Sequence, residues 1–170
     1  MKPVAFMSYV RNDDVSGRLS HFREALSLEV RTQTGEEFPI FQDRSSIQWG
    51  ENWKDRIASS LSEVSFLIPI VTPAFFKSPA CRCELEQFIK HERKLHRNDL
   101  VLPVYYVECP LLSNETKRAT DKLAQAIWSH QYVDWRELRL ESPDSTRVAK
   151  RLAELASHVR DALERVNAFT

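Results

Sequence analysis

Short apolar segments alternate with longer amphipathic segments along this chain, and this alternation limits its fold more than any other feature. The apolar segments have the length and composition of strands, and they cover residues 4–9, 38–41, 66–71, 100–107 and 132–135. Between them, apolar residues recur every three or four positions, which is typical of helices that bury one face. Such alternation predicts an α/β fold, flavodoxin-like in size, with a five-stranded parallel sheet flanked by helices on both faces.

The apolar periodicity also places the helices. We expect them over residues 19–30, from residue 53 to 61, and over residues 81–89, 123–127 and 148–163. Trp53, Trp128 and Trp135 fall on core positions, so we expect them to pack in the interior. Pro69 and Pro103 lie inside apparent strands. Since proline cannot donate to a strand ladder, we expect each at a strand end or at an edge.

Composition restricts the function classes. The 170 residues suit a single domain, with its core at about residues 4–160, and 24 basic residues balance 24 acidic ones. With no net charge, no global field favours nucleic acid or an anionic membrane. The apolar segments are too short to cross a bilayer, and the first residues do not resemble a secretory signal. Three cysteines predict reduced thiols in the cytoplasm, and neither they nor the five histidines have metal-ligand spacing.

One carboxylate stands out. The polar stretch from Lys77 to Leu85 follows the third strand and runs into a helix, which places Glu84 in the first turns of that helix. Ligands of open α/β sheets bind at the carboxyl ends of the strands, so Glu84 is a candidate for chemistry. The alternative is a solvated glutamate that the helix dipole favours at a helix start.

Four short motifs occur in order along the chain. They are Phe6-Met7-Ser8-Tyr9 at the end of the first strand; Phe41, Asp43, Ile47 and Gly50 around the second; Ser78, Cys81, Glu84 and Leu85 after the third; and Pro103-Val104-Tyr105-Tyr106 in the fourth. Together they resemble the motifs of the Toll/interleukin receptor (TIR) domain, over residues 4 to about 159. Two positions depart from the pattern. Plant members usually carry Trp where this chain has Ala80, and the Arg that often precedes the loop glycine is Trp49 here.

The resemblance implies an enzyme. Many bacterial and plant TIR domains and some animal ones cleave the bond between nicotinamide and ribose in NAD+, giving ADP-ribose or a cyclic isomer. Nicotinamide leaves as a neutral molecule and needs no general acid, whereas the positive charge growing on the ribose needs a carboxylate. Glu84 occupies the catalytic position of the family. NAD+ is then the substrate, and no cofactor is expected.

The same resemblance suggests residues for substrate binding. They are Phe6, Ser8, Tyr9, Arg11, Asp43, Trp49 and Tyr106. Aromatic faces can hold the planar rings, and Arg11 can pair with phosphates, although a plain surface cation is its alternative. Strand alternation sends Tyr105 and Tyr106 to opposite faces, so at most one lines the pocket, and core packing is the alternative for either. The acidic pair Asp13 and Asp14 is expected to cap the first helix.

Two other functions compete with the enzyme. A non-catalytic TIR-TIR signalling module would need only self-association, but such adaptors often lack the glutamate found at Glu84. A phosphoacceptor receiver domain would need Asp after the third strand and Lys after the fifth, and the chain has neither. The resemblance further implies self-association through the loop Asp43 to Asn52, a fused or associated sensor domain, and a role in bacterial antiviral defence.

Overall fold

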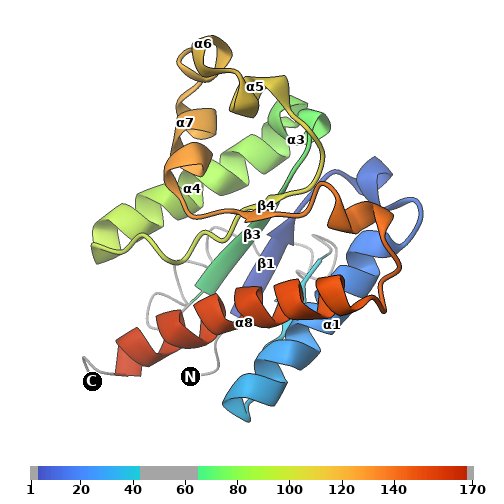
Figure 1. The fold of residues 1–170 in the computed structure, drawn as a ribbon. Coiled ribbons are helices and arrows are strands. Elements are labelled where there is room, and N and C mark those ends of the chain that lie inside the picture. The colour runs from blue at the N-terminus through green and yellow to red at the C-terminus, as the bar shows by residue number, and fades with distance from the viewer. Residues whose placement is uncertain (1–3, 43–64, 168–170) are drawn as a thin grey trace, which may run out of the picture.

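The computed structural model describes residues 4–42 and 65–167, and their five strands form one sheet in which every neighbouring pair is parallel. The strand order is β2-β1-β3-β4-β5 (Figure 1). The strands are β1 (Val4–Ser8), β2 (Ile40–Phe41), β3 (Ser65–Val71), β4 (Val104–Tyr105) and β5 (Val133–Asp134). The predicted α/β fold with a five-stranded parallel sheet is confirmed.

Helices cover both faces of the sheet. One layer holds α1 (Arg18–Thr34) and α8 (Thr146–Asn167), and the other holds α3 (Pro73–Lys77), α4 (Pro79–Leu95), α5 (Pro110–Ser113), α6 (Glu115–Arg118) and α7 (Lys122–Ser129) (Figure 1). Two 3-10 turns, η1 (Arg11–Asp14) and η3 (Leu138–Leu140), follow β1 and β5. The helices expected around residues 19–30, 81–89, 123–127 and 148–163 are all present. The one expected at residues 53–61 lies outside the described residues.

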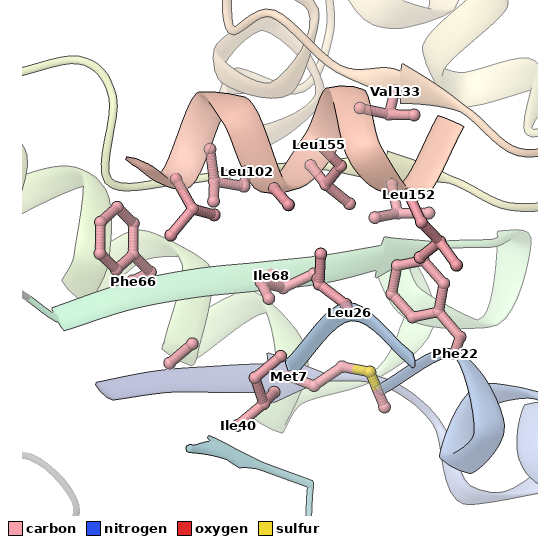
Figure 2. Close-up of a cluster of buried hydrophobic side chains, with 14 of the residues drawn as sticks. Met7, Phe22, Leu26, Ile40, Phe66, Ile68, Leu102, Val133, Leu152 and Leu155 are labelled. Carbon is pink, nitrogen blue, oxygen red and sulfur yellow. The ribbon is translucent and has the colours of Figure 1, made fainter. Parts of the chain in front are cut away.

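The central strand β3 is buried on both faces, which explains its continuous apolar run. Phe66 and Ile68 face the layer of α1 and α8, where they meet side chains such as Leu155 (Figure 2). Leu67 and Val71 face the layer of α4 and α7. The fold therefore has two hydrophobic cores, one on each side of the sheet.

The tryptophan expectations are met in part. Trp135 is 4% exposed and packs edge-on against Phe22, with ring centroids 5.0 Å apart. Trp128 is 43% exposed, so its predicted interior position is wrong. It lies on α7 under the guanidinium of Arg118, 4.0 Å from the ring centroid, which gives its large ring a partner at the surface. Trp53 lies outside the described residues.

The two prolines differ. Pro103 directly precedes β4, as expected, but Pro69 lies inside the central strand β3, opposite Ser8 of β1, so that expectation is wrong. Leu67 and Val71 form backbone hydrogen bonds with residues 100–107, the segment that contains β4, and Pro69 lies between these two residues. There the ladder is interrupted between an isolated bridge at Val101 and the pairing with Val104, so no donor is needed. The same interruption shortens the fourth strand, predicted over residues 100–107, to two residues plus that bridge.

Candidate functional site

The candidate site lies where β1 ends beside the beginning of α4. Ser78 caps α4 by accepting a hydrogen bond from the backbone N–H of Cys81 at 3.2 Å, and Pro79 occupies the first helical position. Arg82 forms an ion pair with Asp121, the N-cap of α7, at 2.9 Å. The first turns of α4 are therefore held by their own N-cap and by an ion pair to α7.

Glu84 is bound to the first strand. The hydroxyl of Ser8, the last residue of β1, donates a hydrogen bond of 2.5 Å to Oε2 of Glu84. Ser8 is 3% exposed and Glu84 is half-buried. Glu84 is also the sixth residue of α4, beyond the first turn where a helix dipole acts. The alternative of a solvated first-turn glutamate does not describe this side chain.

Phe6 lies on the same face of β1 as Ser8, two residues earlier. Its ring stacks on Phe41 with centroids 5.7 Å apart and an interplanar angle of 29°, and it packs against Phe88 of α4 at 6.3 Å. The structure thus brings three of the predicted site residues together, namely Phe6, Ser8 and Glu84. Their arrangement offers an aromatic ring and a held carboxylate at one end of the sheet.

Three other predicted residues lie elsewhere. Tyr9 is half-buried against the core of α1 and α8, and Tyr106, 7% exposed, belongs to that same core. Burial raises the pKa of the Tyr106 phenol, which fits core packing. Both side chains therefore lie on the sheet face opposite α4 and Glu84. Arg11 is exposed in η1. Asp43, Trp49 and the loop to Asn52 lie outside the described residues.

It is Tyr105 that shares the face of Glu84. Its ring belongs to the core around α4 and α7, and it is 1% exposed. Its hydroxyl accepts a hydrogen bond from the backbone N–H of Cys109 at 3.2 Å, and the guanidinium of Arg136 covers the ring at 4.2 Å. The Tyr105 ring is therefore part of the core, which agrees with core packing, the alternative to substrate binding for this tyrosine.

The acidic pair bridges the edge of the sheet where β1, β2 and β3 end. Asp14 accepts hydrogen bonds from the backbone N–H groups of Leu19 and Ser20 in the first turn of α1, so it caps that helix, although Gly17 occupies the N-cap position itself. The capping predicted for the pair is therefore confirmed for Asp14 and wrong for Asp13. Asp14 also accepts from the side chain of Gln42 at 2.7 Å. Asp13 instead accepts from the buried hydroxyl of Thr72, at the end of β3, at 2.7 Å. The sequence analysis missed this second contact because its partners are 59 positions apart.

A buried ion pair was also missed. Glu92, 3% exposed, accepts from the backbone N–H groups of Leu100 and Val101 at 2.8 Å each, and its Oε2 lies 2.7 Å from Nε2 of His130. Burial disfavours the charged imidazolium, but the hydrogen bonds to Glu92 and to the carbonyl of Ala126 outweigh it and raise the pKa of His130. Glu92 lies in the second half of α4 and His130 directly follows α7, so these contacts join α4 to the end of α7 and to the loop before β4.

Residues 4–42 and 65–167 contain neither a metal-binding cluster nor a membrane-spanning helix. No group of three or more His, Cys, Asp or Glu side chains there is arranged to hold a metal ion. Within the same described part of the chain, every helix is too short or too polar to cross a membrane.

The structure is an α/β domain that holds a carboxylate at the carboxyl edge of its parallel sheet, the edge where sheets of this class bind ligands. The family model described as "TIR domain" matches residues 6–152, and the chain therefore belongs to the TIR domain family. No curated protein matches the chain.

Two solved structures are similar to it at low identity. The TIR domains of the activated Roq1 resistosome that recognises the pathogen effector XopQ are 16% identical, with a TM-score of 0.46 over 91% of this chain and 83% of that one. An oxidoreductase from Corynebacterium diphtheriae is 13% identical, with a TM-score of 0.48 over 93% of this chain and 94% of that one. Neither similarity is close enough to bear on function.

Proposed function

We propose that this TIR domain cleaves NAD+ between nicotinamide and ribose, with Glu84 as the catalytic residue. The observation that supports this most is the position of the Glu84 carboxylate, tied to the end of β1 by Ser8 at the edge where α/β sheets bind ligands. Family membership adds the precedent, because many TIR domains that carry this glutamate have this activity.

The chemistry needs little beyond one carboxylate. The C1′–N bond breaks with its electron pair moving to the nicotinamide nitrogen, which leaves as neutral nicotinamide, while positive charge develops on the ribose. A fixed negative charge at Glu84 stabilises that charge, and its oxygens can accept hydrogen bonds from the ribose hydroxyls. Water then attacks C1′ and loses a proton, giving ADP-ribose. Attack by a nitrogen of the adenine ring in place of water gives a cyclic isomer.

The remaining substrate contacts follow from residue chemistry. Phe6 lies on the face of β1 that Ser8 shares, where its ring packs against Phe41 and Phe88 and would support a planar ring of the substrate. Arg11 is an exposed cation beyond the end of β1 that would pair with the pyrophosphate. Asp43 and Trp49 would complete the site from the loop. Tyr9 and Tyr106 pack in the core on the other face of the sheet, so in this proposal they support the edge of the sheet and do not contact the substrate.

We further propose activation by self-association, in cytoplasmic antiviral defence in bacteria, through the loop Asp43 to Asn52 and together with a fused or associated sensor domain. Family membership supports this part of the proposal. A TIR domain without catalytic activity would signal by assembly alone. Adaptors of that kind often lack the glutamate, so the presence of Glu84 favours the enzyme.

The test follows nicotinamide release from NAD+ by the purified chain over a range of protein concentrations and with a crowding agent. The proposal predicts turnover that rises more steeply than protein concentration and is lost in Glu84→Ala. Glu86→Ala is the matched control, because Glu86 is exposed on the same helix and pairs with the exposed Lys90 one turn later. Absence of turnover under every condition would leave the assembly function.

A further inference from the structure

Two contacts join β1 to α4, and they are equally spaced along both elements. Phe6 packs on Phe88, and Ser8 bonds to Glu84. Two strand residues span about 6.6 Å and four helical residues about 6 Å. The packing of Phe6 on Phe88 therefore brings Ser8 and Glu84 to the same level. The aromatic contact fixes the register of α4 on β1, and the hydroxyl then meets the carboxylate.

The hydroxyl of Ser8 is poorly placed to bind a substrate directly. A serine has one donor hydrogen, and the structure directs it to Glu84. The residue is 3% exposed, so its side chain has little surface to offer a substrate. A glutamate side chain has several rotamers, and a charge-assisted hydrogen bond from a rigid strand limits them.

We infer that Ser8 is a positioning residue for Glu84, holding the carboxylate in the orientation that stabilises the ribosyl cation, and not a substrate-binding residue. The inference rests on the proposed function and adds to it a hydrogen bond that orients the catalytic carboxylate. It differs from the role that the family motif suggested for Ser8, and the two roles predict different kinetics. Loss of a substrate contact raises KM, whereas misplacement of a catalytic group lowers kcat.

The kinetic test compares wild type, Ser8→Ala and Ser27→Ala with NAD+ as substrate. Ser27 is the matched control, because its half-buried hydroxyl donates a 2.6 Å hydrogen bond to the carbonyl of Phe38 in the other helix layer. Ser8→Ala keeps the contact between Phe6 and Phe88, so the register of α4 is retained. We expect kcat to fall about 10- to 100-fold with little change in KM, and Ser27→Ala to match wild type.

A spectroscopic arm is independent of turnover. In protein labelled with carbon-13 at the glutamate carboxyl groups, the Glu84 resonance, assigned with Glu84→Gln, should shift in Ser8→Ala and stay in place in Ser27→Ala. An unmoved resonance overturns the inference. Unchanged kcat in Ser8→Ala, or a raised KM alone, also overturns the inference if kcat of Glu84→Gln is strongly reduced. That result leaves the proposed function intact. No turnover by wild type removes the proposed function itself, and this inference with it.

Discussion

The buried carboxylate of Glu92 allows a sharp test of the fold, through the substitution Glu92→Ala. The change removes the acceptor of two backbone N–H groups, those of Leu100 and Val101, which are 1% and 2% exposed. Each buried donor left without a partner costs about 1–3 kcal/mol. His130 also loses the carboxylate that favours its charge. Breaking one side of a buried pair costs about 3–5 kcal/mol, and we expect the loss of unfolding free energy to fall in that range.

The assay is urea unfolding at pH 6, followed by far-UV circular dichroism and extrapolated linearly to water. Glu86→Ala makes the same substitution on the same helix, where the side chain is exposed and forms a surface ion pair with Lys90. It should cost less than about 0.5 kcal/mol. Glu92→Gln keeps an acceptor oxygen and should fall between the two. If Glu92→Ala costs no more than Glu86→Ala, the buried hydrogen bonds do not stabilise the fold as argued.

Two further predictions concern polar contacts. The pKa of His130 is raised above its ordinary value of 6.5, so its contribution is full below pH 6.5 and declines as pH rises through the folded-state pKa. The stability advantage of wild type over His130→Gln in urea unfolding should shrink accordingly, and an advantage that grows with pH would refute the assignment. Asp14→Ala removes the cap of α1 and the contact to Gln42, and it should lower the free energy of unfolding by about 1–2 kcal/mol. The exposed Asp144→Ala should change it by less than about 0.5 kcal/mol, and equal losses would contradict the capping role.

The sequence predicted the order of strands and helices because each element carries its own periodicity. It overestimated the fourth strand, since an apolar run shows burial but not pairing, and the loop around Leu102 and Pro103 is buried without a continuous ladder. Pro69 was expected at a strand end or an edge for a related reason. The gap in the hydrogen-bond ladder that accommodates it belongs to the neighbouring segment between Val101 and Val104, and nothing in the local sequence around Pro69 shows it.

The candidate site could be predicted only as far as local motifs reach. Phe6, Ser8 and Glu84 come from two motifs on adjacent elements, and the structure brings them together. Tyr106 could not be placed, because alternation shows that Tyr105 and Tyr106 face opposite ways but not which face meets α4. The contact between Asp13 and Thr72 was invisible for the same reason, since no local pattern links the ends of two strands.

The most direct test of the central claim is the rate of nicotinamide release by Glu84→Gln at saturating NAD+, compared with wild type and Glu86→Gln. Glutamine keeps the size and one acceptor oxygen of Glu84, while it removes the negative charge and replaces the second oxygen with an NH2 donor. The account predicts that kcat falls about 10²- to 10³-fold in Glu84→Gln, with KM nearly unchanged, while Glu86→Gln behaves as wild type. Equal kcat values in Glu84→Gln and wild type would show that the charge at Glu84 does not stabilise the transition state.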